Sequence, residues 1–184
     1  MIVARPGERG QTLPDLAIRK ARPSDCAPAL ALINAYAAKG MLLLRSESLA
    51  EQLADFSVVE GGGTIIAGGA LSPLGPGLGE IRSIAVHEDH AGLGIGHTLV
   101  TALFDQARER GFEEVLALTT RVSFFEALGF KVSKRERFID KLKVDCAACP
   151  LDLCCYETAV VKPVASARAR DAGLPHHVRG EEYA

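Results

Sequence analysis

The spacing of apolar residues predicts that the chain opens with a strand and an amphipathic helix. Residues 16–20 form a short, largely apolar run, and Pro23-Ser24 is a typical helix start. Apolar side chains then recur at helical spacing over residues 29–37, and Lys39-Gly40 would end that helix. A second short helix is expected to end near Phe56.

The next part of the chain has the pattern of a β-hairpin followed by a half-buried strand. Residues 57–60 and 64–71 flank the turn Gly61-Gly62-Gly63, as in a hairpin. The Gly- and Pro-rich stretch 72–79 is expected to be a loop, because both residue types interrupt strands. Residues 80–86 then alternate between the two faces of a strand.

A glycine run precedes the most regular helical pattern in the chain. Ile95, Leu99, Leu103 and Ala107 recur every four positions, and Gly111 is a typical helix stop. The remaining elements are expected to be strands over 115–118, 130–133 and 156–161, and a helix over 123–128. Strands and helices alternate only in part. We therefore expect an α/β (α+β) fold in which helices cover both faces of a mixed, mostly antiparallel sheet.

Composition and charge narrow the class of protein. The chain has 184 residues, of which 48% are hydrophobic and 24% are charged, so one globular domain is expected. With 21 Lys and Arg against 23 Asp and Glu, the formal net charge is −2, and the sequence contains no local basic patch. Binding to nucleic acid or to an anionic membrane is therefore not expected.

The two ends of the chain have the composition of terminal segments. Residues 1–11 lack the apolar stretch of a signal peptide or membrane anchor, so we expect a cytoplasmic protein. Residues 1–15 are expected to be a flexible segment, 16–163 the folded domain and 164–184 a polar tail.

The glycine run is a candidate phosphate-binding loop. Ala91-Gly92-Leu93-Gly94-Ile95-Gly96 lies between a predicted strand and a predicted helix, where backbone N–H groups and the positive helix end suit phosphate oxygens. A dinucleotide fingerprint is excluded because its third glycine would fall on His97, and the Gly-Lys-Ser/Thr of a P-loop is absent. A glycine run also serves a tight turn or close helix packing, so neighbouring motifs must decide.

Two motifs in the correct order resemble the GNAT superfamily of acetyl-CoA-dependent N-acetyltransferases. They are Ile81–Val86 with the glycine loop, and Phe124-Phe125-Glu126-Ala127-Leu128-Gly129-Phe130. The resemblance spans about residues 16–163 and implies the GNAT fold, acetyl-CoA as cosubstrate, loop amides that hold its pyrophosphate, and a strand edge that pairs with pantetheine. The cofactor-binding residues that it implies are Ile84, Ala85, Val86, Ala91, Gly92, Leu93, Gly94, Ile95, Gly96, His97 and Phe124.

A closer resemblance is to the short-form N-acetylglutamate synthases, a group of amino-acid N-acetyltransferases. The matching segments are 40–46, 80–86, 118–119, 124–130 and the Cys-containing stretch 145–157. The resemblance implies direct transfer of acetyl from acetyl-CoA to the α-amino group of L-glutamate in a ternary complex, the first step of arginine biosynthesis. By analogy it implies a homodimer. Open alternatives are another acceptor, such as glutamine or a small amine, and a non-catalytic acyl-CoA-binding sensor. The sensor alternative rests on two departures from the family pattern: Ala91 stands where the family has Gln or Arg, and Phe125 stands where many members have Tyr.

The transfer needs a neutral amine, a polarised carbonyl and a proton for the departing thiolate. Glu80 is the candidate base, and strand alternation places it on one face with Arg82; the alternative is a surface ion pair between the two. Many GNAT enzymes have a tyrosine where this chain has Phe125, so no phenol is available there. Thr119 is the candidate donor instead, although threonine in a strand is also an ordinary β-former.

An acceptor with two carboxylates calls for cations in its binding site, and arginines bind carboxylates bidentately. The candidates are Arg45, Arg82 and Lys141, with Leu43 beside Arg45. Arg45 follows four apolar residues, which is typical of a site-lining segment, but also of a snorkelling arginine at a helix start. Lys141 lies in the charged stretch 131–143, for which a solvated face is the default interpretation.

Four of the five cysteines fall close together near the C-terminus: Cys146, Cys149, Cys154 and Cys155. The first pair has zinc-knuckle spacing, but the second pair is adjacent and the intervening loop has only four residues, which is cramped for a tetrahedral site. Unliganded thiols are favoured over zinc or a disulfide, and the chemistry requires no metal. Cys26 is expected to pack in the core.

Overall fold

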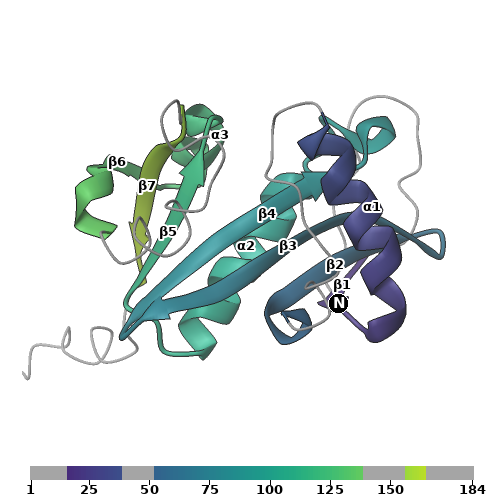
Figure 1. The fold of residues 1–184 in the computed structure, drawn as a ribbon, viewed down its shortest axis with the longest axis horizontal. Coiled ribbons are helices and arrows are strands. Elements are labelled where there is room, and N and C mark those ends of the chain that lie inside the picture. Colours follow the sequence, from purple (N-terminus) through teal and green to yellow (C-terminus); the bar gives the residue numbers. More distant parts are fainter. Residues whose placement is uncertain (1–15, 39–51, 139–155, 165–184) are drawn as a thin grey trace, which may run out of the picture.

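The computed structural model describes residues 16–38, 52–138 and 156–164. Its strands are β1 (Leu16–Lys20), β2 (Phe56–Gly61), β3 (Thr64–Gly75), β4 (Leu78–Val86), β5 (Glu114–Thr119), β6 (Lys131–Ser133) and β7 (Thr158–Pro163). They form one sheet in the order β1-β2-β3-β4-β5-β7-β6 (Figure 1). Only β4 and β5 pair in parallel; the other pairs are antiparallel. The expected mixed, mostly antiparallel sheet is confirmed.

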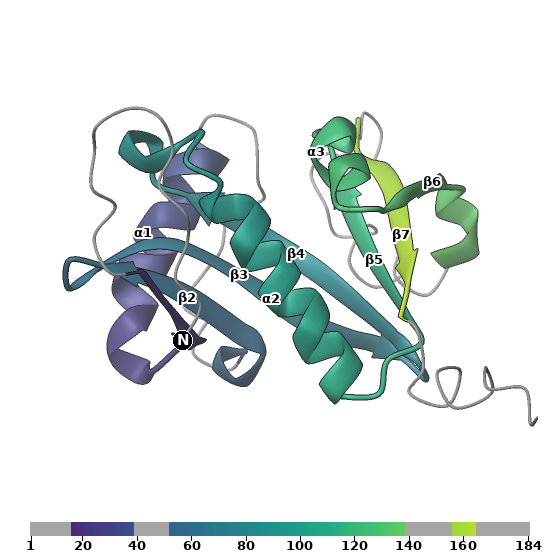
Figure 2. The ribbon, with the colours of Figure 1, turned by 180° about the vertical axis from the view of Figure 1, so that it is seen from behind.

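Helices cover both faces of this sheet, as predicted. The α-helices are α1 (Cys26–Ala37), α2 (Ile95–Glu109) and α3 (Val122–Ala127), and the 3-10 turns are η1 (Pro23–Asp25), η3 (Leu53–Asp55), η4 (Glu88–His90) and η5 (Arg135–Phe138). α1 lies on one face and α2 on the other (Figures 1 and 2). Within the described ranges no helix is both long and apolar enough to cross a bilayer. The expected cytoplasmic location stays a prediction.

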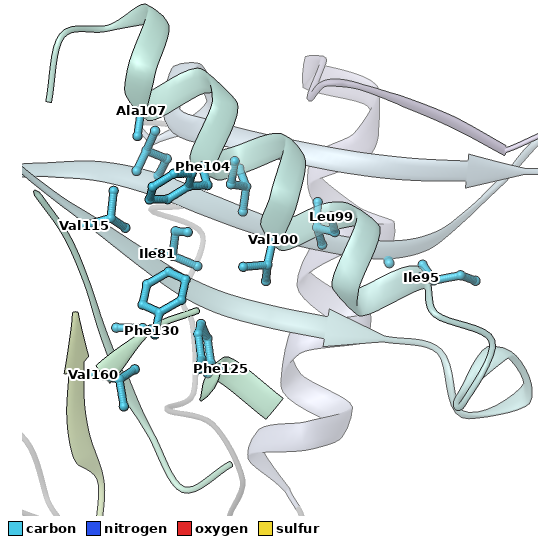
Figure 3. Packing of buried hydrophobic residues seen from close by; sticks show 14 of the residues in the cluster. Ile81, Ile95, Leu99, Val100, Phe104, Ala107, Val115, Phe125, Phe130 and Val160 are labelled. Atoms are coloured by element: carbon cyan, nitrogen blue, oxygen red, sulfur yellow. The ribbon is translucent and has the colours of Figure 1, made fainter. Parts of the chain in front are cut away.

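The apolar residues predicted at four-residue spacing in α2 form the buried side of the helix. Ile95, Leu99, Leu103 and Ala107 are at most 3% exposed and pack against the sheet and α3 (Figure 3). The helix ends at Gly111, whose φ is +74°, and the Phe112 N–H donates to Ala107 O at 3.0 Å. This is a Schellman stop, as the glycine predicted. A second cluster, which includes Ile33 of α1, lies under α1.

The predicted loop over 72–79 is wrong, because β3 and β4 continue through most of it. β3 extends to Gly75 and β4 starts at Leu78, so only a tight turn at Pro76-Gly77 joins them. The pairing of β2 with β3 ends at Ala70, and beyond it β3 is an edge strand. Pro73 fits there because an edge strand does not need every N–H.

The predicted regular alternation along β4 is also wrong, because the strand bulges at Ser83. Ser83 has a φ of +56°, the one positive value among the described non-glycine residues, and the register with β3 shifts at this point. A bulge inserts one extra residue and turns the following side chains over. Ile81 therefore packs in the cluster with α2, whereas Ala85 packs under α1.

An ion-pair network ties β1, η1 and β2 together. Arg19 of β1 donates to both carboxylate oxygens of Asp25, at 2.6 and 3.0 Å, and to Glu60 of β2 at 2.8 Å. Asp25 also accepts the Arg22 N–H at 2.6 Å and is 5% exposed. The hydrogen bond from Arg19, helped by that from Arg22, lowers the pKa of Asp25 to about 2, against the desolvation that burial causes.

Asp25→Asn is expected to lower the free energy of unfolding at pH 7 by roughly 2 kcal/mol, because a carboxylate with a lowered pKa stabilises the fold above its ordinary pKa. That contribution is lost as the pH falls from about 4 to about 2. Urea unfolding at pH 7 and pH 2 measures it, with the exposed Asp105→Asn as the control. A midpoint at pH 7 equal to that of the control would contradict the assignment.

Candidate functional site

The sheet splits between its two parallel strands. β4 and β5 pair through Leu78 with Glu114, Gly79 with Val115, and Glu80 with Leu116. We call the point where this pairing ends, at Glu80, the vertex of the split. Beyond it no further residue pair joins the two strands in the described residues, and the strands diverge (Figure 1). Both continue, to Val86 and Thr119, so each turns an unpaired backbone edge toward the split. An extended ligand can pair with such an edge.

The backbone of Val86 faces this split. The His87 N–H donates to Ile66 O at 2.7 Å, and Val86 lies opposite Ala67. In an antiparallel ladder this makes Val86 and Ala67 a non-hydrogen-bonded pair, so the N–H and C=O of Val86 point away from β3. By alternation Ile84 points the same way, whereas Ala85 turns its backbone toward β3. Of the three candidates for the strand edge, Ile84 and Val86 therefore turn their backbone toward the split, and Ala85 does not.

The glycine loop forms an uncapped helix N-terminus next to this edge. Gly92 and Gly94 have φ values of +78° and +79°, and Gly94 is the N-cap of α2 without a side-chain cap. The Thr98 N–H donates to Gly94 O at 3.0 Å, so the amides of Ile95, Gly96 and His97 precede the helical ladder. Such amides and the helix dipole suit phosphate oxygens.

The remaining cofactor candidates gather near the same place. A Cβ on Gly96 would lie 3.6 Å from Val86 Cγ2 and 3.5 Å from the Phe124 ring, and the His97 ring centroid is 4.9 Å from that of Phe124. The end of β4, the first turn of α2 and α3 thus converge. Ala91 is exposed in the loop and Leu93 packs against the main core.

Phe125 belongs to the core and not to the split. It is 5% exposed, and its ring makes edge contacts with Phe124 and Phe130, both at 5.2 Å. The position at which many GNAT enzymes have a tyrosine is therefore a core position in this chain, and its side chain cannot donate a proton.

Glu80 and Arg82 lie at the vertex of the split. Glu80 is the last residue of β4 that pairs with β5, and it is only 3% exposed. Arg82 Nη1 lies 3.7 Å from Glu80 Oε2, with the Arg82 side chain 20% exposed. The two share one face of β4 and form an ion pair, which is largely buried and not at the surface as the alternative had it. Arg19 and Asp25 also join a buried carboxylate to an arginine, but Glu80 and Arg82 differ in lying where two strands of the sheet part.

Thr119 lies on the other arm of the split, at the end of β5. It is 8% exposed, and its hydroxyl oxygen accepts the Arg121 N–H at 2.9 Å, at the start of α3. That bond occupies one lone pair of the oxygen and leaves the O–H as a donor. Thr119 is three residues past Leu116, roughly 10 Å along the strand from the vertex.

The other predicted site residues lie outside the described residues: Leu43, Arg45, Lys141, Cys146, Cys149, Cys154 and Cys155. Two residues at the split carry no motif signal. Tyr36, in the last turn of α1, donates its hydroxyl hydrogen to Val86 O, and Ser83 forms the bulge. The sequence offers only weak signals for them. These are a tyrosine at the end of a predicted helix and the Gly68-Gly69 pair opposite the bulge.

The open strand edge beside the split and the glycine loop next to it are the features that the resemblance to GNAT acetyltransferases implies. The model of the Acetyltransferase (GNAT) family matches residues 16–130, and the chain belongs to this family. The GNAT fold, the acetyltransferase class and acetyl-CoA as cosubstrate are thereby confirmed.

Three known proteins illustrate the relationship. An uncharacterized N-acetyltransferase of Chlorobaculum tepidum is 36% identical over 149 residues, 80% of this chain and 96% of that protein. An amino-acid acetyltransferase of Mycobacterium tuberculosis is 37% identical over 116 residues, 61% of this chain and 67% of that protein. The structure of N-acetylglutamate synthase from Neisseria gonorrhoeae, complexed with coenzyme A and N-acetyl-glutamate, superposes with a TM-score of 0.74 at 26% identity. It covers 82% of this chain, which spans only 35% of the gonococcal chain.

Gly94→Ala is expected to raise the KM for acetyl-CoA about tenfold with kcat little changed, because a side chain disfavours the left-handed backbone that the loop needs. The matched variant is Gly63→Ala, which has the same φ of +79° and open space around an added Cβ but lies in the turn between β2 and β3. It should stay within about twofold of the wild type. Steady-state kinetics with varied acetyl-CoA measures both, and equal effects of the two variants would contradict the assignment of the loop.

Proposed function

We propose that the protein transfers the acetyl group of acetyl-CoA to the α-amino group of L-glutamate, giving N-acetylglutamate for arginine biosynthesis. The observation that carries the proposal is the burial of Glu80 beside Arg82 at the vertex of the split. The names of the mycobacterial relative and of the gonococcal synthase support an amino acid as acceptor.

The direction of β4 supports this position for the chemistry. β4 runs from Glu80 at the vertex to Val86 beside the glycine loop, six residues or roughly 20 Å. A pyrophosphate held by the loop amides would send the pantetheine arm back along the Ile84 and Val86 edge. The thioester at the end of that arm would then lie toward Glu80.

In the proposed reaction Glu80 takes a proton from the ammonium group of glutamate, directly or through a water. The neutral nitrogen attacks the thioester carbonyl, the N–C bond forms and the C–S bond breaks. The nitrogen loses its second proton as the amide forms, that proton passes to the thiolate of coenzyme A, and Glu80 releases the first proton to water. The O–H of Thr119 is the proposed hydrogen-bond donor to the sulfur. The amine attacks the thioester itself, so no enzyme nucleophile is required.

Arg82 is proposed to serve the acceptor as well as Glu80. Its guanidinium has five N–H donors, so it can contact Glu80 and a substrate carboxylate together. Leu43, Arg45 and Lys141 remain proposed contributors to the same acceptor site. A basic residue beside the general base also favours an anionic amino acid over a neutral amine.

Two departures from the family pattern favour a second candidate, an acyl-CoA-binding sensor without turnover. Phe125 offers no phenol to the thiolate, and Ala91 offers no side chain to the pyrophosphate. Neither departure removes the strand edge or the loop amides. The sensor and the enzyme therefore share cofactor binding and differ in turnover.

An acceptor panel separates these functions. The purified full chain is incubated with acetyl-CoA and glutamate, glutamine, aspartate or a simple primary amine, and thiol release and acetylated product are measured. Glutamate is expected to have the highest kcat/KM. Turnover of another acceptor without glutamate turnover would overturn the substrate assignment, and coenzyme A binding without turnover of any acceptor would favour the sensor.

Glu80→Gln is expected to lower kcat by about 10² to 10⁴, the usual contribution of a general base, with coenzyme A affinity little changed. The deficit should shrink as the pH rises, because more of the amine then reaches the site already neutral. Glu109→Gln, on the exposed side of α2, is the control. A pH-independent deficit, or a loss of coenzyme A binding, would show that Glu80 supports structure and does not act as a base.

A further inference from the structure

The geometry points to Tyr36 as a positioning residue of the cofactor-binding strand edge. Tyr36 lies in the last turn of α1, and its hydroxyl donates a hydrogen bond to the backbone carbonyl of Val86. Its ring packs into the cluster under α1 that includes Ile33 and Ala85. The ring is therefore anchored in the core, while the hydroxyl reaches the last residue of β4.

The carbonyl that Tyr36 contacts is one that faces the split. Val86 forms a non-hydrogen-bonded pair with Ala67, so its C=O points away from β3. In a complete sheet the next strand would donate to such a carbonyl. Within the described residues β5 has already diverged at this point, and the Tyr36 hydroxyl donates to one of the two lone pairs of the oxygen, which leaves the other for an amide of the ligand.

This contact matters because little else holds the end of β4. The bulge at Ser83 interrupts the strand, and from Ile84 onward β4 is bonded to β3 on one side only. The direction of the Val86 backbone decides whether its N–H and C=O meet the amides of an extended ligand. Tyr36 fixes that direction before the ligand arrives, and such preorganisation lowers the cost of binding.

The inference rests on the cofactor edge of the proposed function but not on its acceptor. Tyr36 is not placed among the groups that touch the reacting atoms. Its removal should therefore weaken the binding of coenzyme A, and the KM for acetyl-CoA should rise with little change in kcat. A purely structural role for Tyr36 would lower thermal stability and leave both binding parameters unchanged.

Tyr36→Phe tests the inference because it removes the hydroxyl and keeps the ring. The Kd for coenzyme A, measured by calorimetry without acceptor, is expected to rise about fivefold, the value of one hydrogen bond. The matched control is Tyr156→Phe, whose residue is 85% exposed. A Kd equal to that of the control would overturn the inference whatever the melting temperatures. Weaker binding together with inactivity toward glutamate would leave it standing while the proposed acceptor fails.

If Tyr36→Phe is unfolded at the assay temperature, hydrogen exchange of the wild-type chain tests the role of Tyr36 instead. Coenzyme A is expected to protect amides at the end of β4 and in the last turn of α1 together, because Tyr36 joins them. Protection of β4 with no change in α1 would overturn the inference.

Discussion

The divergence of β4 from β5 is the constraint on which the rest of the site depends. The parallel pairing stops after Glu80, and the bulge at Ser83 follows within three residues. On the strand opposite, Gly69 faces the bulge and Gly68 precedes it. A Cβ on Gly68 would lie 2.7 Å from the Phe56 ring, and one on Gly69 would lie 2.3 Å from Ile84 Cδ1. Gly69 thus leaves room for the Ile84 side chain beside the bulge, Gly68 leaves room for Phe56 of β2, and the bulged strand leaves an unpaired edge.

Core packing positions the phosphate-binding loop and the strand edge. Ile95 follows the N-cap of α2 directly and is 3% exposed, so the burial that holds α2 on the sheet also fixes the loop amides. On the other face α1 packs over Ala85 and reaches Val86 through Tyr36. Each side of the sheet thus contributes one support to the proposed cofactor site, and the sheet itself contributes Glu80.

Much of the fold follows from local sequence patterns, and the predictions that were wrong share one cause, which is dependence on residues distant in the sequence. The strand at 16–20, the buried stripe of α2 and the stop at Gly111 are each set by residues close in sequence. The apparent loop over 72–79 is strand because β3 has lost its neighbour β2 beyond Ala70, which no local pattern records. The bulge at Ser83 likewise lies opposite Gly69, more than ten residues away, whose missing Cβ leaves room for the Ile84 side chain.

The candidate site divides in the same way. The glycine loop could be predicted because its glycines themselves determine the backbone. They allow the left-handed φ values found at Gly92 and Gly94. Glu80 could be placed on a strand, but its burial at a vertex arises only when two strands part. The role of Tyr36 depends on which carbonyl of β4 lacks a strand partner, a property of register and not of motif.

A crystal structure of the full chain with coenzyme A and N-acetylglutamate tests the central claim most directly. The account predicts pantetheine amides bonded to the backbone of Ile84 and Val86. It also predicts the acetylated nitrogen within about 3 Å of the Glu80 carboxylate, or one water from it. A pantetheine arm outside the split, or a nitrogen beyond the reach of Glu80, would contradict it.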